Sequence, residues 1–267
     1  MLNQVKYIVA VASGKGGVGK STTAVNLALA LQASGKHVGV LDADIYGPSI
    51  AMMLAVPENQ KPEIIDGKLF RPIQAHGLAT MSMAYLATEQ TPMVWRGPMA
   101  AGALQQLLQQ TDWGELDVLV VDMPPGTGDI QLTLAQQAQV SGAVIVTTPQ
   151  DIALLDAKKG IEMFLKVKIP VLGIVENMAT HICTECGHEE SIFGHGGGAE
   201  IAQTYQTKLL GSLPLDRSIR EQGDVGDPSM LAAGRAEIAD SYRQIGEAVI
   251  AALAETDGGQ SPEIVFQ

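Results

Sequence analysis

The stretch SGKGGVGKST, residues 13–22, decides the fold of this chain of 267 residues. It matches the pattern G-x-x-x-x-G-K-[ST] at Gly14, Gly19, Lys20 and Ser21. The apolar run YIVAVA before it predicts a buried strand, and the residues after it predict a helix. A strand, a glycine-rich loop and a helix N-terminus direct backbone N–H groups and the positive end of a helix dipole at phosphate oxygens. The sequence therefore predicts a phosphate-binding loop.

The rest of the chain repeats the alternation of strand and helix. Short runs rich in Val and Ile lack the polar alternation of a half-exposed sheet, which indicates a buried parallel sheet. We expect strands at residues 7–12, 37–42, 116–122, 142–148, 170–176 and 208–214. We expect helices at residues 21–33, 99–110, 129–139, 151–165, 199–205 and about 237–254. This order predicts an α/β fold with a doubly wound, mostly parallel sheet and helices on both of its faces.

Domain boundaries follow from local composition. We expect one domain over residues 1–254 and a flexible tail over 255–267, because the tail contains Gly, Ser and Pro and is polar until its last residues. Residues 57–74 carry several prolines and mixed charge, which predicts an irregular insertion or lid. Within it, LFRPIQ, residues 69–74, is a candidate short edge strand.

The composition narrows the class of partner. Seventeen Lys and Arg residues against 29 Asp and Glu residues give a formal charge of −12, which disfavours nucleic acid or an anionic membrane as the main partner. The N-terminal apolar run reaches the glycine-rich loop after a few residues, which favours a first strand over a signal peptide. We therefore expect a cytoplasmic protein that binds neither nucleic acid nor membrane.

Carboxylates at predicted strand ends complete the nucleotide site. VVDMPPGTGD places Asp122 at the end of a buried strand, where an open α/β sheet presents ligand-binding groups. VLDADIYGPS places Asp42 and Asp44 at the end of another strand. Lys20 is expected to contact the β and γ phosphates, with Ser21 as a ligand of Mg²⁺ and Asp122 holding the ion through water.

The only two cysteines, Cys183 and Cys186, form one C-x-x-C pair. A redox dithiol, thiols without a ligand, and a zinc site completed by two of His181, His188 and His195 are all compatible with it. If two copies of the chain faced each other, the two pairs would supply four thiolates. Four is the number that a [4Fe–4S] cluster takes.

The chain resembles a known family along residues 5–250. KGGVGKST resembles the deviant Walker A motif of the MinD, ParA and nitrogenase iron protein group. The blocks LDADIYGPS, WRGPM, DMPPGTGD, TTPQDIALLDAKKG, ENMATHICTECG, IFGHGGG and LPLDRSIREQGDVGDP resemble, in their order, those of the Mrp/ApbC family of iron–sulfur cluster carrier ATPases.

The resemblance implies a P-loop NTPase fold and an ATP-dependent carrier that binds an iron–sulfur cluster between two protomers and transfers it to apoproteins. It implies slow hydrolysis of ATP to ADP and phosphate, with Lys15 reaching across a homodimer and with Lys20 and Asp44 as further catalytic residues. Asn177 would read adenine, and Pro214 would close over the base. Nucleotide would contact Gly14, Lys15, Gly16, Gly17, Val18, Gly19, Lys20, Ser21 and Thr22.

The metal sites complete these expectations. Ser21, Asp42 and Asp122 are expected at Mg²⁺, and Cys183 and Cys186 at a cluster, [4Fe–4S] by thiolate count. Two alternatives remain open at this point. One is a spatial-organising ATPase like MinD or ParA, which would need a basic C-terminal helix that EIADSYRQIGEAVIAALAE lacks. The other is a nucleotide-gated scaffold with structural zinc.

Overall fold

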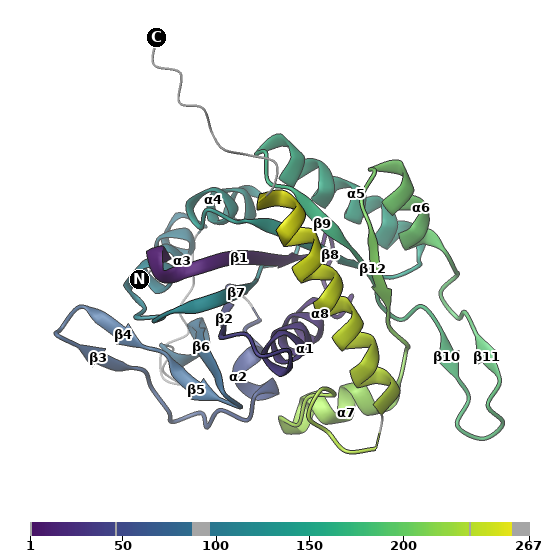
Figure 1. Ribbon diagram of the computed structural model, residues 1–267, viewed down its shortest axis with the longest axis horizontal. Coiled ribbons are helices and arrows are strands. Elements are labelled where there is room, and N and C mark those ends of the chain that lie inside the picture. Colours follow the sequence, from purple (N-terminus) through teal and green to yellow (C-terminus); the bar gives the residue numbers. More distant parts are fainter. Residues whose placement is uncertain (1, 46, 87–96, 235, 258–267) are drawn as a thin grey trace, which may run out of the picture.

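The computed structural model describes residues 2–45, 47–86, 97–234 and 236–257 (Figure 1). An eight-stranded sheet runs through its centre in the order β12-β9-β8-β1-β7-β2-β6-β5, and every neighbouring pair is parallel except β5 and β6. The strands are β1 (Val5–Ala12), β2 (Val38–Asp42), β5 (Ile73–Ala75), β6 (Leu78–Ser82), β7 (Leu116–Asp122), β8 (Gly142–Thr147), β9 (Val171–Glu176) and β12 (Leu209–Ser212).

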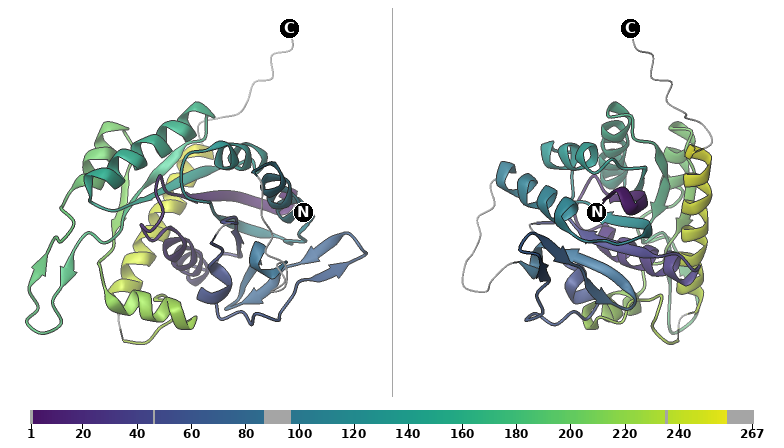
Figure 2. Two further views of the ribbon diagram at one scale, coloured as in Figure 1. Left: turned by 180° about the vertical axis from the view of Figure 1, so that it is seen from behind. Right: turned by 60° about the vertical axis from the view of Figure 1, so that its left-hand side comes forward.

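Helices cover both faces of this sheet (Figures 1 and 2). On one face α1 (Lys20–Ala33) packs against α8 (Ala236–Asp257). On the other face each helix contacts the next, in the order α3 (Gly97–Gln110), α4 (Asp129–Gln137), α5 (Asp151–Lys166) and α6 (Gly197–Thr204). Short elements complete the set: α2 (Ile50–Met53), α7 (Arg217–Val225), η1 (Leu2–Gln4) and η2 (Met83–Tyr85). The doubly wound architecture predicted from the sequence is therefore confirmed.

The core is aliphatic and lies on both sides of the central strands. Val9 and Val11 in β1 and Leu119 and Val120 in β7 are fully buried. Aromatic residues make up only 4% of the chain, so branched aliphatic side chains fill most of the interior. Burial on both faces explains why these strands read as continuous apolar runs. Because the central strands are parallel, the loops that follow them lie at one edge of the sheet.

Residues 57–74 are more regular than the sequence indicates. β3 (Glu63–Ile65) and β4 (Leu69–Arg71) form an antiparallel hairpin, in which Arg71 pairs with Glu63. The expectation of an irregular insertion is wrong for these strands, which contain too few residues to produce a clear periodicity. The expected edge strand is confirmed in part, because β5 is the last strand of the main sheet. Pro72, which has no N–H to donate, separates β4 from β5.

The C-terminal boundary lies later than expected. α8 continues to Asp257, so residues 255–257 are helical and not part of a tail. The remaining tail residues, 258–267, and Trp95 and Arg96 of the WRGPM block lie outside the described residues. Within the described part of the chain, no helix is both long and apolar enough to cross a membrane.

A second small hairpin carries the thiols. β10 (His181–Ile182) and β11 (Glu189–Glu190) are antiparallel and project from the body at the end of the molecule opposite the β3–β4 hairpin (Figures 1 and 2). β10 follows β9 after four residues, so the hairpin is attached directly to the carboxyl edge of the sheet.

Candidate functional site

The loop between β1 and α1 requires glycine at two positions. A Cβ atom at Gly14 would lie 2.0 Å from the backbone oxygen of Asp156 in α5. At Gly19, where φ is +84°, a Cβ would lie 2.1 Å from the side-chain nitrogen of Asn177. By contrast, nothing among the described residues comes within 4 Å of a Cβ built at Gly16 or Gly17. The loop is thus packed tightly at both ends and leaves space in its middle, where phosphate groups would meet its backbone.

Lys20, the first residue of α1, is buried at the end of the loop. Its Nζ donates to Oδ1 of Asp122 at 2.6 Å and to the hydroxyl of Ser21 at 3.1 Å. Oδ2 of Asp44 lies 3.9 Å from the same nitrogen. Burial raises the pKa of Asp122, and the positive charge of Lys20 opposes that rise. The structure therefore brings together four residues that the sequence predicted to share one site.

Asp42 lies next to these residues, and both of its carboxylate oxygens accept hydrogen bonds from the protein. Its Oδ2 accepts from the backbone N–H groups of Ser49 and Ile50 and from the hydroxyl of Ser82, and its Oδ1 accepts from the N–H of Asp44. Burial raises the pKa of Asp42 to about 7, and the neighbouring charge of Asp122 adds to the effect. Ser82 was missed from the sequence, because β6, whose last residue it is, was not predicted.

The donor set at this edge fits Mg²⁺. Oδ2 of Asp122 is buried and has no hydrogen-bond partner among the described atoms, although its other oxygen is paired with Lys20. A carboxylate and a hydroxyl are the oxygen ligands that Mg²⁺ takes beside phosphate and water. Asp122 and Ser21 therefore fit the ion. Both oxygens of Asp42 already accept hydrogen bonds within the protein, which fits a support for the site better than a direct ligand.

The segment that follows β7 also forms a hydrogen bond with the phosphate-binding loop. The N–H of Gly126, four residues after β7, donates to the carbonyl of Ser13 at 2.9 Å. The hydroxyl of Ser13 in turn donates to the carbonyl of Lys15. The segment after β7 is thus hydrogen-bonded to the loop itself.

Asn177 follows β9 and reaches the loop from the side. Its Nδ2 donates to the carbonyl of Val18 at 2.8 Å, and its Oδ1 accepts from the N–H of Met178. The amide keeps one further N–H and one oxygen lone pair for a base. Pro214 is half-buried in the loop after β12, where Leu213 and Leu215 exchange backbone hydrogen bonds with residues 176–180. Asn177 and the Pro214 loop therefore lie side by side.

Two further residues expected to contact nucleotide are Lys15, in the loop, and Thr22, in the first turn of α1. Lys15 is exposed, whereas Lys20 is 6% exposed. The carbonyl of Thr22 accepts from the side chain of Asn26 at 2.9 Å, which fixes the first turn of α1. Lys20 thus contacts carboxylates of its own chain, whereas Lys15 is exposed to solvent.

The two thiols lie in the turn of the β10–β11 hairpin. Cys183 is half-buried and Cys186 is exposed, and neither forms a disulfide. The N–H of Cys183 donates to the carbonyl of His188, and the N–H of Gly187 donates to the carbonyl of Cys183. The pKa of the Cys183 thiol is lowered, mainly by the backbone N–H groups of Cys186 and Glu185 that point at its sulfur. The turn is therefore built to stabilise a thiolate.

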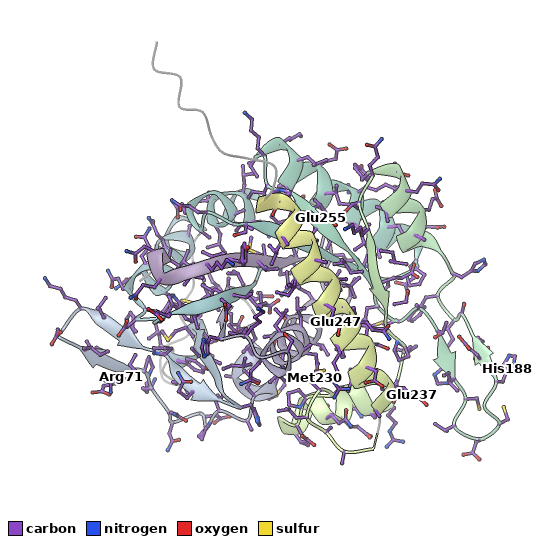
Figure 3. All side chains as sticks on the ribbon, in the orientation of Figure 1. Arg71, His188, Met230, Glu237, Glu247 and Glu255 are labelled. Carbon is purple, nitrogen blue, oxygen red and sulfur yellow. The ribbon has the colours of Figure 1, made fainter. Side chains whose placement is uncertain are left out.

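The histidines do not complete a metal site within one chain. Nδ1 of His181 lies 3.1 Å from the carbonyl oxygen of Leu215, and His188 projects from the hairpin into solvent (Figure 3). His195 is exposed in the loop before α6. Among the described residues, no group of three or more His, Cys, Asp or Glu side chains could hold a metal ion.

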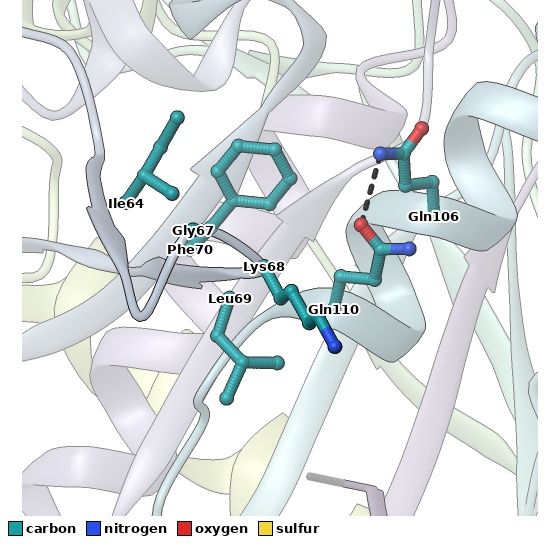
Figure 4. A pocket seen from close by; sticks show the side chains of 7 residues that line it. All are labelled: Ile64, Gly67, Lys68, Leu69, Phe70, Gln106 and Gln110. Atoms are coloured by element: carbon teal, nitrogen blue, oxygen red, sulfur yellow. Dashed lines mark hydrogen bonds between the residues drawn. The ribbon is translucent and has the colours of Figure 1, made fainter.

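A surface hollow elsewhere does not belong to this site. It lies between the β3–β4 hairpin and α3, where Gln106 donates to Gln110 across its rim (Figure 4). None of the residues predicted to bind nucleotide, Mg²⁺ or a cluster lines it. Its lining consists of Ile64, Gly67, Lys68, Leu69, Phe70, Gln106 and Gln110.

A glycine-rich loop between a central parallel strand and a helix, with a carboxylate at the end of the neighbouring strand, defines a P-loop nucleoside triphosphatase. The family model described as "ParA: NUBPL iron-transfer P-loop NTPase" matches residues 4–250. The chain belongs to this family.

Relatives with high identity carry names that agree with the family. A protein of Pseudomonas fragi, named iron–sulfur cluster carrier protein, is 63% identical over 244 residues, which are 91% of this chain and 85% of the relative. A protein of Escherichia coli strain K12 with the same name is 62% identical over 252 residues, which are 94% of this chain and 68% of the relative. The iron–sulfur cluster transfer protein NUBPL of Mus musculus is 53% identical and covers 93% of this chain and 78% of its own.

Solved structures agree on the fold. A nucleotide-binding protein from Archaeoglobus fulgidus, described in complex with ADP and with cobalt, matches with a TM-score of 0.75 and 39% identity over 85% of this chain and 88% of its own. The cell division ATPase MinD of Pyrococcus furiosus matches with a TM-score of 0.69 at 20% identity over 92% of this chain and 99% of its own. The second likeness bears on the fold alone.

Proposed function

We propose that this protein is an ATP-hydrolysing iron–sulfur cluster carrier that works as a homodimer. Two C-x-x-C hairpins would hold one cluster, as cargo, between two protomers and release it to apoproteins. The nucleotide site at the carboxyl edge of the sheet would control that exchange. The names of the relatives support the carrier role, and the site geometry supports the nucleotide chemistry.

The observation that carries the proposal is the position of the thiols. Cys183 and Cys186 are the only cysteines, they lie in a projecting turn, and the described residues around them supply no third metal ligand. Two thiolates are too few for a cluster or for a tetrahedral zinc site. A second copy doubles the number to four. An exposed site of this kind suits cargo that is handed on.

The nucleotide chemistry assigns a role to each buried group. Lys20 would exchange its contact with Asp122 for the β and γ phosphates, and Asp44, 3.9 Å from Lys20, would orient the attacking water. Lys15, exposed in the loop, would reach the phosphates bound by the partner subunit. Asn177 and the Pro214 loop would hold adenine from two sides.

Mg²⁺ would be held by Ser21 and Asp122, and when bound it would neutralise charge on the transferred phosphate. Asp42 would support the groups around Mg²⁺ through Asp44, because Asp42 accepts a hydrogen bond from the N–H of Asp44. The protein's own contribution would be to exclude water and to orient the groups, because Asp42 and Asp122 are fully buried.

Anaerobic reconstitution with iron and sulfide tests the cargo. We expect one cluster per dimer, with the absorption and Mössbauer spectra of [4Fe–4S]. Cys183→Ala or Cys186→Ala should abolish it and leave nucleotide binding nearly intact. Thr184→Ala, in the same turn, is the matched control and should keep the cluster. Stoichiometric zinc without iron would instead favour a structural zinc site, and a full cluster in the double cysteine variant would place the cargo elsewhere.

Single-turnover and steady-state hydrolysis test the nucleotide site. Lys15→Ala should lose most ATP turnover while its affinity for ATP changes little, because Lys15 would act on the partner subunit's phosphates. Lys68→Ala, an exposed lysine at the other end of the molecule, should change neither. Unchanged turnover in Lys15→Ala would count against a dimer that shares its nucleotides.

A further inference from the structure

The segments that follow β9 and β12 stay paired beyond the edge of the sheet. β9 and β12 are parallel neighbours within it. Past their ends, the N–H of Leu213 donates to the carbonyl of Glu176, and the N–H of Ala179 donates to the carbonyl of Leu213. The N–H of Leu215 then donates to the carbonyl of Thr180 at 2.7 Å. The two segments therefore run side by side as far as the start of the β10–β11 hairpin.

His181 adds a side-chain bond to this pairing. Its Nδ1 lies 3.1 Å from the carbonyl oxygen of Leu215, and the residue is half-buried. A carbonyl oxygen can only accept, so Nδ1 carries a proton and donates. His181 is also the first residue of β10, and Cys183 follows it by two residues. One side chain thus joins the loop after β12 to the base of the hairpin that carries the thiols.

The same paired segments reach the nucleotide site at their other end. Asn177, four residues before His181, donates to the carbonyl of Val18 in the phosphate-binding loop at 2.8 Å. Pro214, proposed above to lie against adenine, directly precedes Leu215. A base held between Asn177 and Pro214 would therefore hold in place the two segments that the His181 bond joins.

A second histidine in the hairpin differs from His181 in its surroundings. His188 follows Cys186 by two residues, just as His181 precedes Cys183 by two. However, His188 is exposed and projects into solvent (Figure 3). The two histidines are thus equally close in sequence to a thiol, and His181 is the one whose ring is bonded to the loop after β12.

We propose that His181 is a positioning residue that couples nucleotide binding to the β10–β11 hairpin through its bond to the carbonyl of Leu215. The inference rests on the proposed function, in which the base lies against Pro214 and the hairpin holds the cargo. It adds the contact by which the first site acts on the second. A bound base fixes the loop after β12, and the bond to His181 then holds the hairpin against that loop. Local opening of the hairpin becomes rarer when nucleotide is bound.

Hydrogen exchange of the full chain, with and without saturating Mg²⁺ and ADP, tests this coupling in the absence of any cluster. The N–H groups of Cys183 and Gly187 are the reporters, because both are hydrogen-bonded within the hairpin. ADP should slow their exchange about fivefold, the lower end of the usual range for coupled sites. The β3–β4 hairpin, at the opposite end of the molecule, is the internal control (Figures 1 and 2). Its exchange should not respond to ADP.

Three variants assign the response to the His181 bond. His181→Phe keeps a ring and removes the N–H, so the reporters should no longer respond to ADP. His181→Asn should recover most of the response, because Nδ2 of asparagine is bonded to Cγ as Nδ1 of histidine is. His188→Phe is the matched control and should respond like the parent. Circular dichroism and titration with ADP should show that all three are folded and saturated.

A merely structural role for His181 would give a different result. In that case His181→Phe would exchange faster in both conditions but would respond to ADP as fully as the parent, which would overturn the inference. A His181→Asn protein that responds no better than His181→Phe would overturn it as well, since the bond would then not be what carries the response.

The outcomes separate this inference from the proposed function. If the parent's hairpin does not respond to ADP, the coupling through His181 is wrong, and reconstitution with iron and sulfide still decides the carrier role. If the parent responds and His181→Phe does not, but the parent binds no iron after reconstitution, the coupling stands and the carrier role fails.

Discussion

Lys20 and Asp122 form a buried ion pair 2.6 Å long across the nucleotide site, and the second oxygen of Asp122 has no partner among the described atoms. The lysine that would bind phosphate therefore neutralises the carboxylate that would hold Mg²⁺. Arrival of nucleotide and metal together would replace this pair without leaving either charge buried alone. Binding of one is thereby expected to favour binding of the other.

The stability of the nucleotide-free protein should depend on this pair. Lys20→Ala leaves Asp122 buried without a partner, which should lower the free energy of unfolding by about 3–5 kcal/mol. Adding Asp122→Asn should recover much of the loss, because the unpaired charge is then removed. Urea denaturation measures both. The control is Arg220→Ala, which breaks exposed pairs with Asp224 and Glu221 and should cost less than about 1 kcal/mol. Equal losses in Lys20→Ala and Arg220→Ala would contradict the prediction.

Nucleotide preference should depend on Asn177. Asn177→Ala removes both the hydrogen bond to Val18 and the proposed contact to adenine, so ATP affinity should fall by about tenfold, the effect of one to two hydrogen bonds. Competition between ATP and GTP should also show weaker preference for ATP. Asn26→Ala is the control, since that side chain holds the N–H of Met230 and the carbonyl of Thr22. It should lower stability but keep the preference for ATP.

The Cys183 thiol should react at lower pH than an ordinary thiol. Its pKa is lowered chiefly by the N–H groups of Cys186 and Glu185, which stabilise the thiolate and are present only in the folded turn. In Cys186→Ala, where both N–H groups remain, the rate of alkylation by iodoacetamide should reach its half-maximum at lower pH than for the same variant unfolded in urea. Identical pH profiles in the two states would show that the turn does not act on the thiol.

Two glycines should respond oppositely to alanine. Gly14→Ala places a methyl group 2.0 Å from the backbone oxygen of Asp156, so it should destabilise the protein by about 1–3 kcal/mol and displace the phosphate loop. Gly223→Ala, within α7, meets nothing within 4 Å and should stabilise it by about 0.5–1 kcal/mol. Urea denaturation and ATP binding measure both effects. A Gly14→Ala protein as stable as its parent would show that α5 yields freely at Asp156.

The larger elements and the nucleotide loop could be predicted from the sequence because their signals are local. A buried strand, the spacing from Gly14 to Ser21 and the helix after it are continuous in the chain, so periodicity and motif agree. Short elements such as β3, β4 and α2 carry too few residues for a periodic signal. Their positions follow from contacts with distant segments, as when Gly226 of the α7 C-terminus meets Ala55 after α2.

By itself, then, the sequence determined the fold class, the phosphate loop and the C-x-x-C spacing of the two thiols, since each depends on residues close together in the chain. Only the tertiary structure decided that both oxygens of Asp42 accept hydrogen bonds from backbone N–H groups, while one oxygen of Asp122 has no partner among the described atoms. It also decided that Asn177 holds Val18, 159 residues away, and that His181 reaches the carbonyl of Leu215, 34 residues away. Burial and hydrogen-bond partners depend on segments far apart in the chain, and a reading along the sequence does not bring those segments together.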